Sequence, residues 1–272
     1  MIGPKGQPAK PSILQFPFVW VGQGVRAFAE ELGRIVSLLG QTALNMFQRP
    51  VRWRETLQMI GFIGVQSLPI ILLSAVFTGG VFTVESDEAF RLFGAQGLVG
   101  GTVGVALTRE LSPTLTGLLV AGRAGSALAA EIGSMRVSEQ IDAMYAMAVD
   151  PVNYLVKPRV VAAVIAVPLL TACFDLFGIG GSYLVAIHVL HLSPPEFMVR
   201  LEDWVDWADI RAGLVKAVVF GAIIGVVACS KGFHTSGGAA GVGRATTSAV
   251  VVSSVAILVA NYFIALLLQG QT

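Results

Sequence analysis

The chain has 272 residues, of which 54% are hydrophobic and only 13% charged, and its mean hydropathy is +0.75. Soluble domains carry about 25% charged residues, so this composition excludes a soluble domain and indicates an integral membrane protein. The net charge of +1 gives no electrostatic reason to bind nucleic acid. Cys173 and Cys229 lie in apolar runs, which favours small buried side chains over a disulfide or a redox pair.

The N-terminal part divides into two segments. Residues 1–22 form an extension whose apolar patch is short, is broken by Pro17 and lacks a small-residue cleavage site. We therefore predict no signal peptide and a cytoplasmic N-terminus. Residues 23–56 set apolar positions at helical spacing against a charged face, which predicts an amphipathic helix lying in the membrane interface rather than spanning it.

Five apolar segments follow, each long enough for the roughly 20 helical residues that cross a bilayer. They are residues 60–84, 92–130, 160–187, 210–230 and 245–268. The second segment has the length of either one extended helix or a hairpin of two. One crossing places twelve Lys or Arg residues on one side and three on the other, whereas two crossings give ten and six. The sharper asymmetry favours five spans, with the N-terminus inside and the C-terminus outside.

Two adjacent charges, Arg109 and Glu110, stand well inside the second span. An unpaired charge there costs at least about 2.5 kcal/mol, so both must pair, face water or bind a charged ligand. Pro113 cannot donate to the carbonyl of Arg109, which distorts the helix beside them. One interpretation is ion pairing, either with each other or with another charge in or near the spans: Arg123, Glu131 or Asp175. The other is a cavity in which Arg109 binds the phosphate of a lipid-like substrate.

Small residues recur at every fourth position further along the second span: Gly117, Ala121, Gly125 and Ala129. Such a stripe lets another helix approach closely. Packing within the chain is the favoured interpretation, and a contact between subunits is the alternative. Residues 134–151 then form a short amphipathic segment on the predicted cytoplasmic side. This segment is either a solvated loop helix or a surface that docks onto a cytoplasmic partner.

Motifs for catalysis or metal binding are absent from the sequence. There is no GxxxxGK[ST] motif, so the chain lacks the phosphate-binding loop of P-loop ATPases. His188, His191 and His234 lack matching Cys, Asp or Glu spacing, and no metal site is predicted. Glu110 and Asp175 leave one rival function open, a proton-coupled secondary transporter that needs no ATPase.

Three segments carry a resemblance to a known family: residues 109–151, 158–170 and 241–254. Within the first, AGRAGSALAAEIG, SEQIDAM and AVDP follow one another in that order. These segments resemble the MlaE/YrbE-type permeases of lipid-transporting ABC systems, and the likeness extends from about Leu32 to the C-terminus.

The resemblance implies an all-α integral membrane protein with an N-terminal interfacial elbow helix, five transmembrane helices and a short cytoplasmic coupling helix. Its permease domain would cover residues 57–272, in the inner membrane. It also implies a homodimer, a phospholipid substrate moved between that membrane and the periplasmic side, and ATPase subunits that bind ATP and Mg²⁺, so that this chain holds no cofactor and is not an enzyme. An MCE-domain protein and a STAS-domain protein are further partners in the Mla branch.

Matching residue by residue assigns the sites that the resemblance implies. The residues expected to meet the ATPase are Arg136, Glu139, Gln140, Asp142 and Met144. Arg109 and Glu110 would stand beside the lipid cavity. Its apolar part would be lined by Phe82, Phe90 and Phe93.

Overall fold

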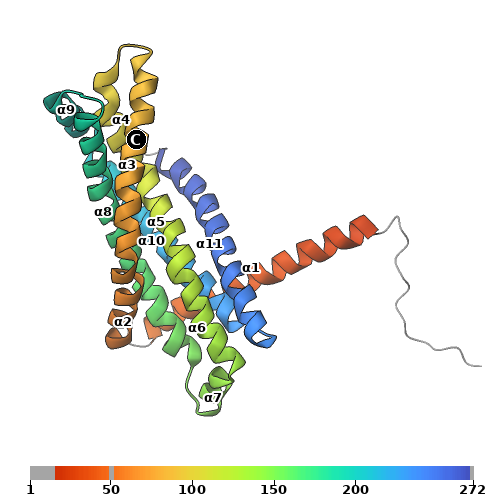
Figure 1. Cartoon of the computed structure of the whole chain (residues 1–272). Helices are drawn as coiled ribbons and strands as arrows, with labels where there is room; N and C mark the ends of the chain where they lie inside the picture. Colours follow the sequence, from red (N-terminus) through yellow and green to blue (C-terminus); the bar gives the residue numbers. More distant parts are fainter. Residues whose placement is uncertain (1–15, 49–51, 270–272) are drawn as a thin grey trace, which may run out of the picture.

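The computed structural model describes residues 16–48 and 52–269, and these residues form helices with no β-strand (Figure 1). Within this described part, five helical stretches are long and apolar enough to cross a membrane. They are Trp53–Arg91, Gln96–Val137, Val152–His188, Trp207–Phe233 and Gly238–Leu268. The second runs from one end of the bundle to the other as a single stretch rather than a hairpin. The predicted all-α fold with five spans is therefore confirmed.

Several spans are built from shorter helical pieces. The first contains α2 (Trp53–Ile63), η1 (Val65–Ser67) and α3 (Leu68–Arg91). The second contains η2 (Gln96–Leu98), α4 (Val99–Ala106), η3 (Leu107–Leu111), α5 (Ser112–Val120), η4 (Ala121–Gly125) and α6 (Ser126–Val137). The others are η5 (Val152–Val156) with α8 (Lys157–His188), α10 (Trp207–Phe233) and α11 (Gly238–Gln269). Two short connecting helices, α7 (Gln140–Ala146) and α9 (Pro194–Trp204), lie at opposite ends of the bundle (Figure 1).

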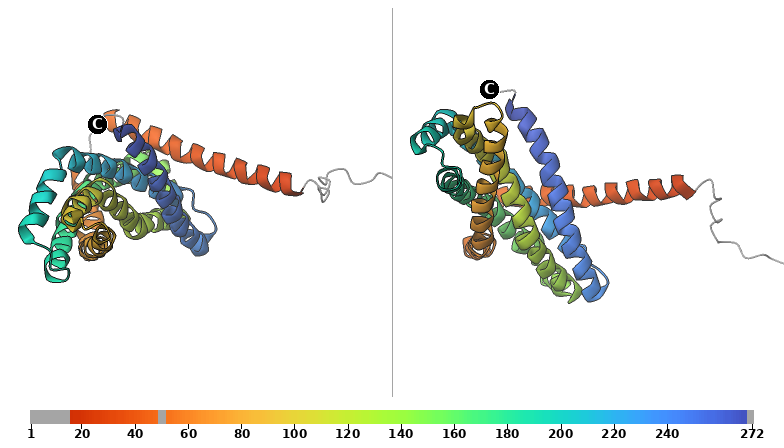
Figure 2. Two further views of the ribbon diagram at one scale, coloured as in Figure 1. Left: turned by 90° about the horizontal axis from the view of Figure 1, so that it is seen from above. Right: turned by 45° about the horizontal axis from the view of Figure 1, so that its top comes forward.

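The N-terminal helix α1 (Phe16–Gln48) lies crosswise to the bundle and extends away from it (Figures 1 and 2). Its bounds differ from the predicted range of 23–56. The helix starts at Phe16, so residues 16–22 are helical, while residues 1–15 of the predicted extension lie outside the described residues. It is described as far as Gln48, and residues 53–56 of the predicted range belong to α2 instead.

The first span is broken between α2 and α3, just before Pro69. Pro69 has no N–H group, so it leaves the carbonyl of Val65 without its usual helical donor. Arg123 of the second span closes this break: its Nη1 donates to the carbonyl of Phe62 at 2.8 Å and to Ser67 Oγ at 3.0 Å. A membrane-embedded arginine is therefore satisfied by backbone and hydroxyl oxygens at an irregular point of the neighbouring helix.

The core lies where α3, α8 and α10 pack side by side, and glycines set their spacing. A Cβ on Gly79 of α3 would lie only 2.0 Å from the carbonyl oxygen of Gly178 of α8. On the other side of α8, a Cβ on Gly221 of α10 would lie 2.5 Å from the carbonyl oxygen of Ala163. The backbone of α8 is thus in direct contact with α3 on one side and with α10 on the other.

We expect the substitution Gly79→Ala to destabilise the fold, because the added methyl group overlaps the backbone of α8 and forces the helices apart. Overpacking of this kind costs about 1–3 kcal/mol. The matched control is Gly180→Ala on α8, where nothing lies within 4 Å of the added Cβ. Denaturant-induced unfolding of the purified protein, followed by tryptophan fluorescence, should show a lower midpoint for Gly79→Ala alone. A wild-type midpoint for that variant would contradict the close packing.

Candidate functional site

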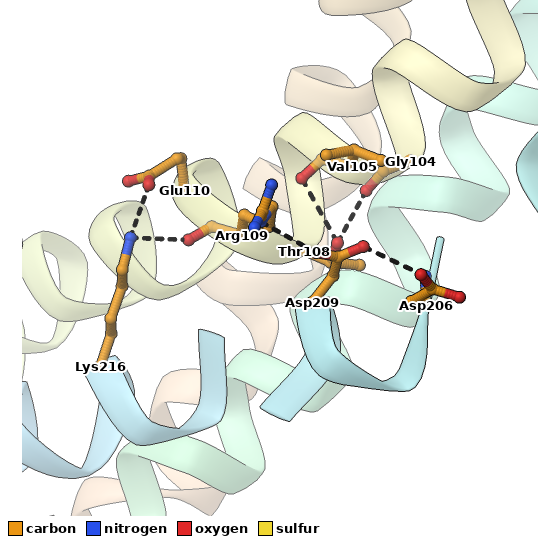
Figure 3. Close-up of polar contacts among 8 residues, drawn as sticks. All are labelled: Gly104, Val105, Thr108, Arg109, Glu110, Asp206, Asp209 and Lys216. Atoms are coloured by element: carbon orange, nitrogen blue, oxygen red, sulfur yellow. Dashed lines mark hydrogen bonds and ion pairs between the residues drawn. The ribbon is translucent and has the colours of Figure 1, made fainter. Parts of the chain in front are cut away.

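Four charged side chains form two ion pairs between the second span and α10 (Figure 3). Arg109 Nε lies 2.8 Å from Asp209 Oδ1, and Lys216 Nζ lies 2.6 Å from Glu110 Oε1. The last span adds a fifth residue, since Asn261 Nδ2 donates to Glu110 Oε2 at 3.0 Å. We call these five residues the charged cluster. Its two positive and two negative charges balance, which makes it tolerable inside a membrane.

Pro113 explains how the helix beside the cluster is shaped. Because Pro113 has no N–H group, the carbonyl of Arg109 has no helical donor, and residues Leu107–Leu111 form a π-helical segment, η3. Lys216 Nζ donates to this carbonyl at 3.0 Å as well as to Glu110. Segments of π-helix are rare and frequently mark functional sites. Here the carbonyl of Arg109, which Pro113 leaves without its α-helical donor, is a second acceptor for the buried ammonium group of Lys216.

The start of α10 positions Asp209. Asp206 and Asp209 form a reciprocal capping box, in which the Asp206 backbone N–H donates to Asp209 Oδ2 at 3.1 Å. The other carboxylate oxygen of Asp209, Oδ1, faces Arg109. One turn later, a Cβ on Gly213 would lie 2.2 Å from the carbonyl oxygen of Thr108, so only glycine lets α10 approach η3 this closely. The cap and the glycine together place Asp209 and Lys216 of α10 opposite Arg109 and Glu110.

Exposure within the charged cluster is asymmetric. The side chains of Asp209 and Lys216 are 10% and 2% exposed, whereas those of Arg109 and Glu110 are 39% and 47% exposed. Both oxygens of Glu110 already accept a hydrogen bond. The Nη1 and Nη2 groups of Arg109 make no hydrogen bond to any residue that the structure describes. Arg109 therefore has free donors on its exposed side chain, while its Nε pairs with the buried carboxylate of Asp209.

A cavity of about 190 Å³ opens beside these free donors. Its lining residues come from the second span, α10 and α11: Val105, Ala106, Arg109, Glu110, Ala212, Lys216, Ala265 and Leu268. The walls thus combine five apolar side chains with three charged ones, of which Arg109 and Glu110 are the accessible pair.

The structure corrects the ion pairs suggested for Arg109 and Glu110. They do not pair with each other or with Arg123, Glu131 or Asp175. Arg123 closes the break in the first span. The carboxylate of Glu131 lies 2.7 Å from Arg159. The predicted partners were wrong because they were charges on the second and third spans, whereas the actual partners, Asp209 and Lys216, lie on α10.

The predicted phenylalanines do not line the cavity in a single chain. Phe82 and Phe90 are half-buried on α3 and pack against the core. Phe93 follows the end of α3 and is 83% exposed. The end of α3, which Phe90 and Phe93 flank, lies at the end of the bundle that carries α9 (Figure 1). The proposed role of all three phenylalanines in binding acyl chains remains a prediction.

The stripe of small residues faces helices of the same chain. Ala121 and Ala129 are fully buried. A Cβ on Gly117 would lie 3.3 Å from Phe220 and 3.4 Å from Ile257, and one on Gly125 would lie 3.4 Å from Ile224. The stripe is therefore filled by α10 and α11, which leaves it covered within one chain.

The segment predicted to meet the ATPase contains α7. Glu139 precedes this helix in a left-handed conformation, with φ 60°, and Glu139, Gln140 and Asp142 are exposed. Arg136 forms an ion pair with Asp142 across the turn. Met144 is half-buried and packs toward the bundle instead. The role of this segment as the surface that meets the ATPase remains a prediction.

Sequence reasoning missed three members of the cluster: Asp209, Lys216 and Asn261. Lys216 had a usable signal, because it is the one charge between residues 212 and 230 of an otherwise apolar span. Asp209 resembles any acid in the outer connection, and its importance depends on the capping geometry. Asn261 had only the weak signal of an amide in the last span.

Comparison with known proteins gives the cluster a family context. Residues 56–267 match the family described as Permease MlaE. The chain belongs to the MlaE permease family. A relative in Haemophilus influenzae, the intermembrane phospholipid transport system permease protein MlaE, is 35% identical over 251 residues, which cover 92% of this chain and 96% of the relative.

Two other relatives of this MlaE-family chain are more similar in sequence. A probable ABC transporter permease protein of Rickettsia prowazekii is 42% identical over 245 residues, or 90% of this chain and 94% of the relative. The chloroplastic protein TRIGALACTOSYLDIACYLGLYCEROL 1 of Arabidopsis thaliana is 40% identical over 245 residues, or 90% of this chain and 67% of the relative. The chain is accordingly a multi-pass permease of the ABC transporter class and not itself an enzyme.

Proposed function

We propose that two copies of this chain form the membrane pathway of an ABC transporter that moves phospholipids between the inner membrane and the periplasmic side. The observation that carries the proposal is the charged cluster, which keeps Arg109 accessible beside a partly apolar cavity inside a spanning bundle. The name of the Haemophilus influenzae relative supports phospholipid as the substrate class. A separate ATPase chain would bind ATP and Mg²⁺ and supply the energy.

In this proposal the lipid phosphate binds the free Nη groups of Arg109. Asp209 occupies Nε only, so a phosphate oxygen can accept from the remaining donors without breaking the existing pair. Acyl chains would lie against the apolar surface around the cavity, including Ala265, Leu268 and the half-buried or exposed Phe82, Phe90 and Phe93. Glu110, fixed by Lys216 and Asn261, would keep the headgroup from moving further into the bundle.

We also propose the remaining partners: a second copy of this chain, the ATPase, an MCE-domain protein and a STAS-domain protein. Much of α11 is exposed, including Val255, Leu258, Val259, Tyr262 and Leu266, and a second copy would cover part of this surface. Residues 136–142 would dock onto the ATPase on the cytoplasmic side, which places the N-terminus inside and the C-terminus outside. An MCE-domain protein would attach on the periplasmic side, and a STAS-domain protein on the cytoplasmic side.

Substitution of Arg109 tests this function. In liposomes that contain the complete complex with its ATPase, we expect Arg109→Gln to reduce ATP-dependent transfer of a fluorescent phospholipid by tenfold or more, because hydrogen bonds to charged groups contribute about 1.5–3 kcal/mol. Glu110→Gln, measured separately, should also reduce transfer. The control is Arg91→Gln, an exposed arginine at the end of α3. Wild-type transfer in both cluster variants would remove these residues from the site.

The rival proton-coupled mechanism makes a different prediction. It requires Glu110 and Asp175 to exchange protons, yet no hydrogen bond between described residues links the two. Asp175 is buried on α8, and its Oδ1 has no hydrogen-bond partner among the described residues. Transport driven by a pH gradient without ATP would favour the rival mechanism over the one proposed.

A further inference from the structure

The chain has a second hydrophobic core at the end of the bundle that carries α7, separate from the main core between the spans. This second core joins α1, α6, α7, η5, α8 and α10 through Leu38, Ile132, Ile141, Val152, Leu155, Val156, Val160, Val226 and Cys229. Leu38 of α1 is 7% exposed, and Ile141 of α7 is fully buried. The crosswise helix and the exposed connecting segment therefore share one packed interior.

Polar contacts tie the end of α1 to the same region. Asn45 Nδ2 donates to Asp150 Oδ2 at 3.3 Å, and the backbone carbonyl of Asn45 accepts from Lys157 Nζ at 2.9 Å. The other oxygen of Asp150 accepts from the backbone N–H of Val152 at 3.0 Å. One asparagine thus contacts both the end of the α7 segment and the start of α8.

The position of Asn45 makes its contact with Lys157 costly to break. Asn45 lies near the end of α1 as the structure describes it, and its backbone carbonyl accepts from Lys157 Nζ. Lys157 is 1% exposed, so moving α1 away would remove an acceptor from an ammonium group that water does not reach.

Further contacts hold α1 along its length and support the start of the first span. Lys231 at the end of α10 forms an ion pair with Glu31 of α1. The guanidinium of Arg52, before α2, lies 4.2 Å from the centre of the Tyr154 ring in η5. At the end of the bundle that carries α7, these two contacts join α10 to α1 and the start of the first span to η5.

We propose that Asn45 is a positioning residue that makes α1 and the segment of residues 134–151 move as one body during transport. The inference rests on the proposed function, in which that segment receives the motion of the ATPase. Asn45 itself touches neither lipid nor ATP. It passes movement of the α7 segment to the crosswise helix and, through Lys157, to α8.

The first test measures lipid transferred per ATP hydrolysed in the reconstituted complex. We expect Asn45→Leu to keep the ATPase bound and to lower this ratio at least fivefold. Gln41→Leu is the control: Gln41 is exposed one turn earlier on α1, and among the described residues its amide bonds only Ser37, so the variant should retain the wild-type ratio. The double variant Asn45→Asp with Asp150→Asn restores one donor and one acceptor and should recover most of the ratio. A wild-type ratio in Asn45→Leu, or no recovery in the double variant, would overturn the proposal.

The second test joins the two elements covalently. Asn45→Cys and Asp150→Cys are introduced with Cys173 and Cys229 replaced by alanine, and a short bismaleimide links the new thiols. If the two elements move together, linking should raise lipid transfer per ATP above that of the unlinked protein. A fall on linking would show that they must separate, which contradicts the proposal. Failure of the proposed function would look different, because the wild-type complex itself would then show no ATP-dependent transfer.

Discussion

Lys216→Met is expected to abolish ATP-dependent lipid transfer and to destabilise the protein. The ammonium group of Lys216 is 2% exposed and is the cation that pairs with Glu110 inside the membrane. Breaking a fully buried pair costs about 3–5 kcal/mol. Because Glu110 is 47% exposed and keeps its bond from Asn261, we expect a smaller cost, about 2 kcal/mol. Denaturant unfolding and the liposome transfer assay measure the two effects.

A double variant separates stability from transport for this pair. Lys216→Met combined with Glu110→Gln removes both charges, so no unpaired carboxylate remains and most of the stability should return. Transfer should stay low, because the cluster no longer holds a charged residue at the inner end of the cavity. Recovery of transfer together with stability would mean that Lys216 and Glu110 serve only the fold.

Charge reversal on the exposed face before and within α7 should have the second large effect. We expect the double variant Glu139→Lys with Asp142→Lys to reduce co-purification of the ATPase at least tenfold and to lower transfer in proportion. Both side chains are exposed, so their substitution leaves the second core intact. Affinity purification of the complex, followed by quantification of the ATPase, measures the outcome.

The pair between Arg136 and Asp142 supplies the control for that experiment. Exchanging the two residues, as Arg136→Asp with Asp142→Arg, keeps an ion pair while reversing the surface that a partner would meet. If the acid acts by contacting the ATPase, the exchange should not restore assembly. Full assembly in the exchanged protein would show that the pair only stabilises the turn before α7.

The fold and the candidate site were predictable to different degrees. Spans could be located because roughly 20 apolar residues in a row have few alternatives to a membrane helix, and Lys and Arg asymmetry decided that the second apolar segment crosses once. The predicted crosswise helix of residues 23–56 took in residues 53–56, which belong to α2 at the start of the first span. Arg109 and Glu110 stood out because charges are costly where they lie.

The sequence by itself determined the class of protein, the number of spans and the two conspicuous charges, because each depends on local composition measured against the thickness of a bilayer. Only the tertiary structure decided that Arg109 pairs with Asp209 and Glu110 with Lys216. Those pairs join residues about a hundred positions apart, and they form because Pro113 frees a carbonyl and Gly213 lets α10 touch η3. Such contacts depend on helix packing in three dimensions, which leaves no periodic signal along the chain.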